Sequence, residues 1–285
     1  MQVLTHTPSR KISGIRSALA CAIAAATLLL PAAGQAETPK RWVELDVPYV
    51  PTPDDAVAKM LEMAEVGPRD SVIDLGSGDG RIAIAAVRDR EAQNALGVDI
   101  DPARVKEANA NARKARVEGR VTFKKQDLFK TDIANASVLT MYLLPDVNLA
   151  MRPVILEKMA PGSRVVSHAF TMGDWQSDRR EMVDGRSLYL WIVPAKAAGT
   201  WQVQDPAGAF ALTLEQQYQQ VRATAQRDGA ALPVSDATLR GTELRFTLDD
   251  GGKPRQYVGV IEGDRMQARS GDGLHGGWQA TRQAR

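Results

Sequence analysis

The stretch at residues 72–81, VIDLGSGDGR, constrains the fold more than any other part of the chain. It follows an apolar run, precedes an alanine- and isoleucine-rich segment, and places glycines at 76, 78 and 80. A glycine-rich turn between a strand and a helix lets the backbone approach a ligand and directs helix N–H groups toward it. The stretch therefore predicts a strand-turn-helix unit that binds a ligand at its turn.

Residues 37–196 alternate between helical and strand-like patterns at the spacing of parallel βαβ units. We expect helices at 54–64, 81–88, 102–115 and 147–159, strands at 71–75, 94–100, 121–125, 137–143 and 164–170, and a final antiparallel hairpin of 180–183 and 187–193. This order predicts an α/β domain with a doubly wound, mostly parallel seven-strand sheet.

The pattern changes after residue 196. Residues 200–285 show short alternating runs separated by turn signals such as Asp228-Gly229 and Asp250-Gly251-Gly252. The runs lie at 201–204, 210–216, 218–225, 243–248, 256–263, 265–270 and 278–282. We expect a second domain here, a small all-β antiparallel meander that closes into a barrel or sandwich.

The first 36 residues have the composition of a targeting segment. Arg10, Lys11 and Arg16 precede an apolar run of about 16 residues, and Gly34-Gln35-Ala36 follows it. The run is shorter than the roughly 20 residues of a spanning helix. We expect a cleaved signal peptide and an exported, periplasmic protein, with an uncleaved membrane anchor as the alternative and the only route to membrane contact.

Charge and metal-binding residues exclude several classes of function. Three of the 36 basic residues lie in the first 36 positions, which leaves 33 against 34 acidic residues, so we expect no nucleic-acid surface. The one cysteine, Cys21, lies in the signal segment, and only His168 and His275 remain beyond it. We therefore expect neither disulfides nor a metal site.

Three details narrow the ligand at the turn. The glycines have G-x-G-x-G spacing, whereas a dinucleotide fingerprint has its third glycine one residue later. Asp74 lies two residues before the first glycine, where a carboxylate would repel a pyrophosphate but attract an ammonium group. Asp99 ends the next strand, where a carboxylate can accept both ribose hydroxyls. S-adenosylmethionine, which has an amino-acid end, a ribose and no phosphate, fits this pattern.

VIDLGSGDGRIAIAA and the following GVDIDP at 97–102 resemble the first two motifs of the class I S-adenosylmethionine-dependent methyltransferases, over residues 45–195. The resemblance implies that Asp74 lies near the methionine end of the cofactor. It also implies that Gly76, Gly78 and Gly80 form the cofactor turn and that Asp99 binds the ribose.

After the third strand, Gln126-Asp127-Leu128 matches the place where such enzymes bind the adenine. Asp127 would face the adenine amino group, and the Leu128 segment would offer a backbone N–H. Local roles remain open for these carboxylates: Asp74 can cap the turn, Asp99 or Asp101 can cap the helix at Pro102, and Asp127 can be a solvated turn residue.

The segment after the fourth strand indicates the methyl acceptor. Residues 140–148, TMYLLPDVN, lack the Asp/Asn-Pro-Pro-aromatic motif of amino-DNA methyltransferases. Tyr142-Leu-Leu-Pro145, with the leader PYVPTP at 48–53, is similar to the seven-strand protein-lysine methyltransferases that act on mitochondrial inner-membrane proteins. That similarity implies a protein substrate and a lysine acceptor.

We expect the acceptor amine in a slot lined by the Tyr142 hydroxyl and the backbone carbonyls of residues 143–145, with Pro145 at its end. His168 can take up the proton, although a structural histidine is the alternative. Tyr49 and Thr52 of the leader can cover the cofactor as a lid, or the leader prolines can simply stiffen the chain.

Two other functions stay open at this point. The fold can be a non-catalytic envelope module whose C-terminal domain docks a partner, or the acceptor can be a small molecule. A signal peptide also conflicts with a cofactor that is made in the cytoplasm.

Overall fold

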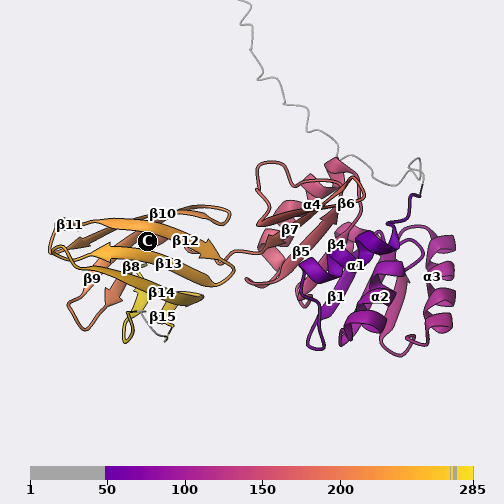
Figure 1. Cartoon of the computed structure of the whole chain (residues 1–285), viewed down its shortest axis with the longest axis horizontal. Coiled ribbons are helices and arrows are strands. Elements are labelled where there is room, and N and C mark those ends of the chain that lie inside the picture. The colour runs from indigo at the N-terminus through magenta and orange to yellow at the C-terminus, as the bar shows by residue number, and fades with distance from the viewer. Residues whose placement is uncertain (1–48, 270, 272–274, 285) are drawn as a thin grey trace, which may run out of the picture. The chain divides into compact units, whose positions relative to one another are not determined.

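The computed structural model describes residues 49–269, 271 and 275–284. The expected signal peptide at 1–36 lies outside the described residues. Two sheets account for the strands, one of seven and one of nine (Figure 1).

The seven-stranded sheet and its helices occupy residues 54–192. The elements in chain order are α1 (Asp54–Met63), β1 (Ser71–Leu75), α2 (Arg81–Arg90), β2 (Asn94–Asp99), α3 (Pro102–Ala115), β3 (Val121–Lys125), the 3-10 turn η1 (Leu128–Lys130), β4 (Val138–Met141), α4 (Pro145–Lys158), β5 (Arg164–His168), β6 (Arg179–Val183) and β7 (Arg186–Ile192). The strand order is β3-β2-β1-β4-β5-β7-β6. Strands β1 to β5 are parallel, and β7 runs antiparallel to β5 and β6. The predicted doubly wound, mostly parallel seven-strand sheet is confirmed.

Apolar side chains cover both faces of this sheet. On one face, Met60 of α1 and Ile84 of α2 pack in one cluster with Val72 of β1. On the other, Met151 and Ile155 of α4 pack with Ile73, the next residue of β1. Neighbouring residues of a strand point to opposite faces, so β1 contributes to both clusters. The arrangement gives the three layers of a doubly wound fold.

Two strands, β4 and β5, end two residues earlier than the sequence pattern predicts. β4 ends at Met141 instead of residue 143, and α4 begins at Pro145, which suits the first position of a helix. β5 ends at His168 instead of residue 170, because Ala169 has a φ of 67° and takes the chain out of the extended conformation. Both early ends leave more irregular chain at the carboxyl edge of the sheet.

The nine-stranded sheet is antiparallel throughout. Its strands are β8 (Gly199–Gln204), β9 (Phe210–Gln217), β10 (Gln220–Arg227), β11 (Ala230–Leu232), β12 (Val234–Arg240), β13 (Glu243–Asp249), β14 (Pro254–Glu262), β15 (Arg265–Ala268) and β16 (Gln279–Arg282). The order is β11-β10-β9-β8-β16-β15-β14-β13-β12. β10 and β12 also approach each other, so the sheet is nearly closed into a barrel around Trp201, Phe210, Phe246 and Tyr257. The expected antiparallel barrel-like fold is confirmed.

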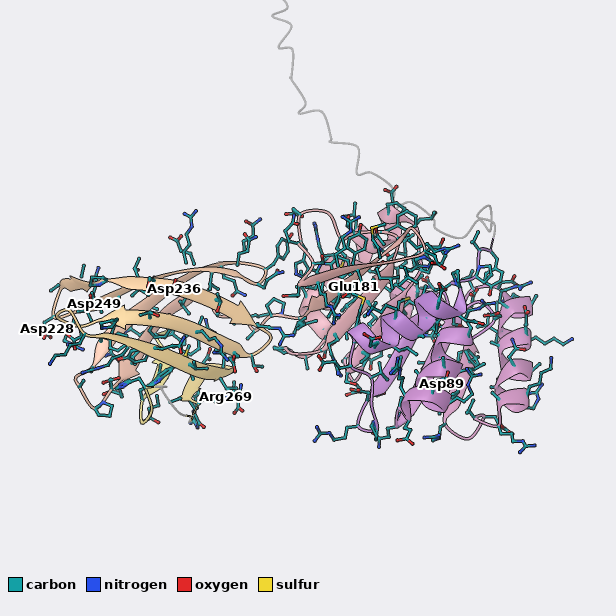
Figure 2. All side chains as sticks on the ribbon, in the orientation of Figure 1. Asp89, Glu181, Asp228, Asp236, Asp249 and Arg269 are labelled. Carbon is teal, nitrogen blue, oxygen red and sulfur yellow. The ribbon has the colours of Figure 1, made fainter. Side chains whose placement is uncertain are left out.

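The sequence pattern missed β11 and β12. β12 contains a register shift between Ser235 and Thr238, and Asp236 has a φ of 54°, which interrupts the alternation of side chains. Figure 2 labels Asp236 together with Asp228 and Asp249, the latter two at one end of this sheet. Among the described residues, no helix is long and apolar enough to cross a membrane.

Candidate active site

The candidate site lies where the parallel strands of the seven-stranded sheet end. β2 and β4 flank β1 on opposite sides, so the order of strands reverses there. Doubly wound sheets bind ligands outside the carboxyl ends of the strands at such a reversal. Asp74 is the fourth residue of the five in β1, and Asp99 and His168 are the last residues of β2 and β5.

The glycine turn between β1 and α2 requires glycine at each of its three positions. Gly76, Gly78 and Gly80 have φ values of 72°, 53° and 83°. A Cβ atom at Gly78 would lie 2.3 Å from the Tyr49 ring, and one at Gly80 would lie 2.4 Å from the Phe123 ring. Both the conformation and the close packing exclude a side chain. The turn therefore exposes backbone rather than side chains.

Asp74 is a buried carboxylate with one unused oxygen. Its Oδ1 accepts a hydrogen bond of 2.7 Å from the Thr140 hydroxyl, whereas Oδ2 is buried without a partner. Burial raises the pKa of Asp74 to about 7, and the negative charges of Asp99 and Asp79 act in the same direction. The nearby Ser77 hydroxyl is also buried and unpartnered. Buried polar atoms without partners are rare, and these two are ready to bind a ligand with a cationic or hydrogen-bonding end.

Asp99 and Asp101 divide two tasks at the end of β2. The two carboxylate oxygens of Asp99 accept hydrogen bonds from the N–H groups of Gly78 and Asp101, each at 2.9 Å. Asp101 caps α3 by accepting from the Ala103 N–H at 2.7 Å. Each Asp99 oxygen still has a free lone pair. Asp99 thus holds the glycine turn and can accept further donors, while the ribose role stays a prediction.

Asp127 begins the short turn η1. Its Oδ1 accepts from the Phe129 N–H at 2.9 Å, and its Oδ2 lies 3.9 Å from the Lys130 ammonium. Leu128 is the first residue of η1, so its own N–H has no partner within the turn. The bond to the Phe129 N–H gives Asp127 the local role of a turn residue, which was one of the two roles considered for it. The roles of Asp127 and Leu128 toward adenine stay predictions.

Tyr49 of the leader lies over the glycine turn. Its hydroxyl accepts a hydrogen bond of 3.2 Å from the Asp79 N–H, and its ring contacts Gly78 closely. The Arg104 guanidinium of α3 lies 4.8 Å from the ring centroid on one side. Tyr49 keeps 43% of its surface exposed. This position suits the predicted lid.

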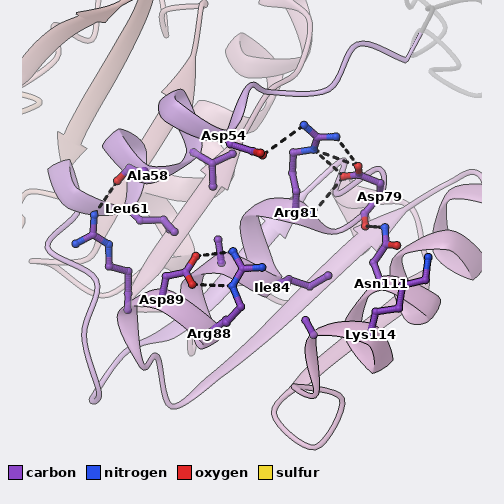
Figure 3. A pocket seen from close by; sticks show the side chains of 14 residues that line it. Asp54, Ala58, Leu61, Asp79, Arg81, Ile84, Arg88, Asp89, Asn111 and Lys114 are labelled. Atoms are coloured by element: carbon purple, nitrogen blue, oxygen red, sulfur yellow. Dashed lines mark hydrogen bonds and ion pairs between the residues drawn. The ribbon is translucent and has the colours of Figure 1, made fainter.

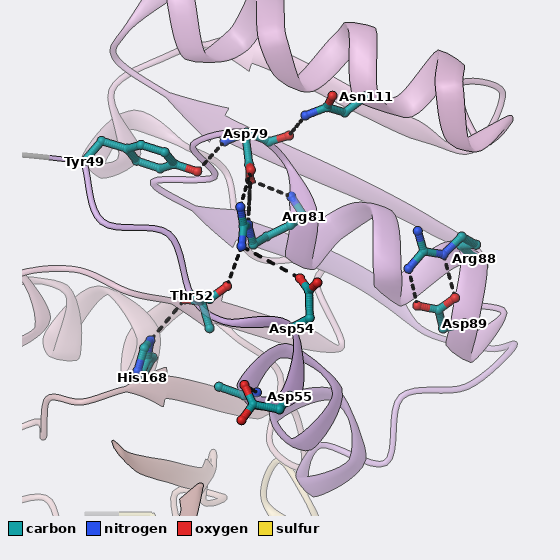
Figure 4. A network of polar contacts seen from close by, with 11 residues as sticks. Tyr49, Thr52, Asp54, Asp55, Asp79, Arg81, Arg88, Asp89, Asn111 and His168 are labelled. Carbon is teal, nitrogen blue, oxygen red and sulfur yellow. Dashed lines mark hydrogen bonds and ion pairs between the residues drawn. The ribbon is translucent and has the colours of Figure 1, made fainter. Parts of the chain in front are cut away.

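Arg81 joins the leader to the glycine turn (Figure 4). Its Nε and Nη2 atoms donate to the Asp79 carboxylate, at 2.6 Å for the shortest bond. Its Nη1 donates to the Thr52 carbonyl at 2.9 Å and lies 3.8 Å from the Asp54 carboxylate. Burial acts to raise the pKa of Asp79, but the hydrogen bonds from Arg81 outweigh it and hold that pKa below its usual value.

His168 is buried beside Thr52 and Tyr142. Its Nδ1 lies 3.1 Å from the Thr52 hydroxyl, and its ring centroid lies 4.0 Å from that of Tyr142. Burial lowers the pKa of His168, and the positive charge of Arg186 adds to the effect. The imidazole is therefore neutral at pH 7. The Thr52 side chain faces this histidine, 3% exposed, whereas its neighbour Tyr49 covers the turn.

The early start of α4 changes the expected acceptor slot. The Leu144 carbonyl already accepts from the N–H groups of Val147 and Asn148. Pro145 lies in the first helical turn, where a carbonyl accepts from the residue four positions later, and its side chain is exposed. Three carbonyls were predicted to line the slot. Those of Leu144 and Pro145 are engaged in the first turn of α4, so the Leu143 carbonyl is the one that remains available for the acceptor. Tyr142 remains at the edge of the site and stacks on Phe170 at 6.4 Å.

Comparisons with known proteins identify the family. A family model described as "ANTKMT methyltransferase domain" matches residues 74–179. A protein-lysine N-methyltransferase of Saccharolobus islandicus is 43% identical over 151 residues, which cover 52% of this chain and 94% of that protein. The mouse adenine nucleotide translocase lysine N-methyltransferase is 31% identical, and the match covers 47% of this chain and 58% of that protein.

A crystal structure of an RNA methyltransferase from Salinibacter ruber in complex with S-adenosyl-L-homocysteine is also similar. It is 48% identical, with a TM-score of 0.51, over 52% of this chain and 95% of that one. The chain is a class I S-adenosylmethionine-dependent methyltransferase. The predicted family, enzyme class and cofactor are thereby confirmed.

The residues present in this methyltransferase fit its cofactor. The unpartnered Asp74 Oδ2 provides a buried anionic acceptor, and the glycine turn provides a cradle that a Cβ would fill. Asp99 offers free lone pairs next to that cradle. S-adenosylmethionine carries positive charge and no phosphate, so a carboxylate at the end of β1 suits it.

Sequence reasoning missed three residues that build the methyltransferase site: Arg81, Thr140 and Asn148. Asn148 is fully buried and donates from Nδ2 to the Ser167 hydroxyl at 3.0 Å and to the Phe170 carbonyl at 3.2 Å. The position of Arg81 two residues after Asp79 was a local signal for their ion pair. Thr140 and Asn148 gave no local signal, because their partners lie 66 and about 20 residues away in sequence.

A groove of about 550 Å³ lies between α1, α2 and α3 of the methyltransferase (Figure 3). Its charged side chains are largely paired with one another, as Arg88 is with Asp89 at 2.6 Å. Its lining includes Arg81 but none of Asp74, Asp99 or His168. The groove therefore adjoins the site through Asp79 and Arg81 but does not contain Asp74, Asp99 or His168 at the ends of the strands.

Proposed function

We propose that this methyltransferase transfers a methyl group to the side-chain amine of a protein lysine. The observation that carries the proposal is the buried, neutral His168 beside Tyr142, at the same edge of the sheet as Asp74 and Asp99. The Saccharolobus islandicus relative named as a protein-lysine N-methyltransferase supports the same acceptor.

For the cofactor, we propose the roles that the sequence predicted. Asp74 binds the cationic methionine end, the turn of Gly76, Gly78 and Gly80 contacts the cofactor through its backbone, and Asp99 accepts the ribose hydroxyls. Asp127 and the Leu128 N–H bind the adenine. Tyr49 closes over the turn. S-adenosylmethionine, when bound, supplies an electrophilic methyl group on a sulfonium.

The chemical task of the protein is to present a neutral amine. A lysine with a pKa near 10.4 is neutral in about one molecule in 2,500 at pH 7, so its deprotonation costs roughly 4.6 kcal/mol. His168, whose pKa is lowered by burial, is neutral and can accept the proton. Tyr142 and the Leu143 carbonyl, with Pro145 fixing the start of α4, shape the slot that holds the amine.

RNA and small molecules are the competing acceptors. The similar Salinibacter ruber structure is described as an RNA methyltransferase. Against RNA, residues 37–285 have 33 basic and 34 acidic residues, without the basic excess that phosphate binding needs. A non-catalytic role as an envelope module is opposed by the completeness of the Asp74, Asp99 and glycine-turn set.

The deciding experiment incubates the purified full chain and radiolabelled S-adenosylmethionine with envelope protein, total RNA and a small-molecule extract in parallel. Asp99→Ala provides the control for a defective cofactor site. We expect label in protein, recovered as methyl-lysine after hydrolysis. Label confined to RNA or to a small product, or cofactor binding with no transfer to any fraction, would overturn the proposal.

We propose further that residues 1–36 direct export and that the enzyme, with domains at 37–196 and 200–285, acts in the periplasm. Three basic residues, the apolar run and Gly34-Gln35-Ala36 support this. Mass spectrometry of the protein from cell fractions tests it. A periplasmic chain that begins at Glu37 is expected, whereas a cytoplasmic chain that retains residues 1–36 would contradict it and a membrane-bound one would indicate an anchor.

A further inference from the structure

The leader connects the glycine turn to the buried histidine. Tyr49 accepts a hydrogen bond from Asp79, and the Thr52 carbonyl accepts one from Arg81. Three residues beyond Tyr49, the Thr52 hydroxyl meets His168, which is 116 positions away in sequence (Figure 4). The leader is thus held at both ends of a short segment, one end on the cofactor turn and the other on the imidazole.

The backbone conformation of Thr52 is restricted. Pro51 and Pro53 flank it, and a residue before proline is confined to extended conformations. The side chains of Thr52 and His168 are both buried, with 3% and 2% exposed. A hydrogen bond in such a place has little competition from water and a well-defined geometry.

The Thr52 hydroxyl lies against Nδ1 of the ring, so it bears on where the imidazole proton resides. A neutral imidazole carries one proton, on either Nδ1 or Nε2. A hydroxyl can donate to a bare Nδ1, which places the proton on Nε2, or it can accept from Nδ1–H. The second arrangement leaves a lone pair on Nε2, as a general base requires.

We propose that Thr52 is a positioning residue that holds the proton of neutral His168 on Nδ1, so that Nε2 can accept a proton from the acceptor ammonium. This inference rests on the proposed function of His168. The ammonium N–H bond breaks and the Nε2–H bond forms, while Nδ1–H keeps donating to Thr52. The imidazolium then loses the Nε2 proton to solvent after each turnover.

The other groups around the ring act on its charge rather than on its tautomer. Arg186 on β7 disfavours the imidazolium, and Asp55 in the first turn of α1 favours it. The Tyr142 ring packs against the imidazole at 4.0 Å. The Thr52 hydroxyl lies within hydrogen-bond distance of a defined ring nitrogen, Nδ1.

The test compares the full chain with Thr52→Val, which has the same shape without the hydroxyl, and with Thr52→Ser, which restores it. Nitrogen-15 NMR of the imidazole reports the tautomer directly, and beyond residue 36 only His168 and His275 contribute. We expect the wild type to carry its proton on Nδ1. We expect Thr52→Val to lower kcat for a lysine substrate about ten-fold or more and to shift the acid limb of the kcat profile to lower pH. KM for S-adenosylmethionine should stay unchanged, and Thr52→Ser should recover most of kcat.

Thr224→Val, at an exposed position of β10, is the matched control and should leave kcat unchanged. A wild-type His168 protonated on Nε2, or a Thr52→Val chain with unaltered kcat and pH profile, would overturn the inference while lysine methylation itself stands. Failure of the wild type to methylate lysine would instead overturn the proposed function. The NMR measurement on the wild type decides the tautomer even if Thr52→Val does not fold.

Discussion

The Asp74 carboxylate accepts a 2.7 Å hydrogen bond from the Thr140 hydroxyl of the neighbouring strand and leaves its second oxygen buried without a partner. A buried charge with half of its hydrogen-bonding capacity unused is costly in the absence of a ligand. Two predictions follow from this arrangement.

The first concerns cofactor affinity. Asp74→Asn keeps an acceptor for Thr140 but removes the negative charge, so we expect S-adenosylmethionine to bind at least ten-fold more weakly, which corresponds to about 1.4 kcal/mol. Isothermal titration calorimetry at pH 8 measures the change. Asp101→Asn is the matched control, because asparagine caps a helix as well as aspartate and Asp101 faces α3. Equal affinities of the Asp74→Asn chain and the wild type would contradict the role of the charge.

The second concerns stability against pH. The pKa of Asp74 is about 7 in the folded chain and 3.8 ordinarily, so between these values the folded state holds a proton that the unfolded state has lost. This group's contribution to the free energy of unfolding therefore falls as pH rises from about 4 to 7, by up to roughly 4 kcal/mol, and is constant above. Asp74→Asn lacks this dependence. Urea unfolding of both chains across this range should show the variant gaining stability relative to the wild type, and a constant difference would refute the assignment.

A third prediction separates packing from conformation at the glycine turn. Gly78 and Gly229 both have positive φ, so alanine at either position costs about 1 kcal/mol of folding free energy. Only at Gly78 does the new Cβ meet another side chain, the Tyr49 ring. We expect thermal unfolding to show a loss for both variants and a larger loss for Gly78→Ala, whose Cβ would clash with the Tyr49 ring. Cofactor affinity should fall only for Gly78→Ala, and a loss in both would point to a general effect on the fold.

A fourth prediction concerns the attachment of the leader. Arg81→Lys cannot reproduce the paired donors to Asp79 together with the bond to the Thr52 carbonyl. We expect KM for S-adenosylmethionine to rise several-fold and the free energy of unfolding to fall by about 1–3 kcal/mol. Arg88→Lys, in the same helix and paired with Asp89 at a more exposed position, should change stability by less than about 0.5 kcal/mol. Equal changes in KM and in the free energy of unfolding for the two variants would contradict the role of Arg81 in joining the leader to the glycine turn.

The fifth prediction tests His168 as the base. His168→Gln keeps a side chain that can hydrogen-bond to Thr52 but cannot take up a proton at neutral pH. We expect kcat for a lysine substrate to fall by about 10²–10⁴ with little change in cofactor affinity. The activity of the variant should recover partly at high pH, where solvent deprotonates the amine. Unchanged kcat at pH 7 would assign His168 a purely structural role.

Local patterns in the sequence were sufficient to predict the elements of the seven-stranded sheet. β1, α3 and β3 begin and end at the predicted residues, because apolar periodicity, the Asp101 cap and Pro102 act locally. The ends of β4 and β5 depend on the start of α4 and on a positive φ at Ala169, which no local pattern reports. β12 was missed because its register shift breaks the alternation that identifies strands.

In the candidate site, too, local motifs were predicted from the sequence and long-range contacts were not. The glycine turn with Asp74 and Asp99 is a sequence motif, and its residues come together because adjacent parallel strands end at one edge. Thr52 and His168 were both singled out, but their contact was not, since it joins the leader to β5 across 116 positions. Contacts of this kind depend on how distant elements pack, and no residue spacing in the sequence indicates them.

The nine-stranded sheet places its first strand beside its last. β8, the first strand of this sheet in the sequence, pairs with β16. One of its two neighbours therefore forms only after residues 279–282 have been synthesised. Until then β8 and β15 each lack the partner that separates them in the order of strands. A chain without residues 279–282 would have an interrupted sheet and two unpaired strand edges, which are sites of aggregation. Closure of this sheet thus depends on β16, the strand that comes last in the described chain order.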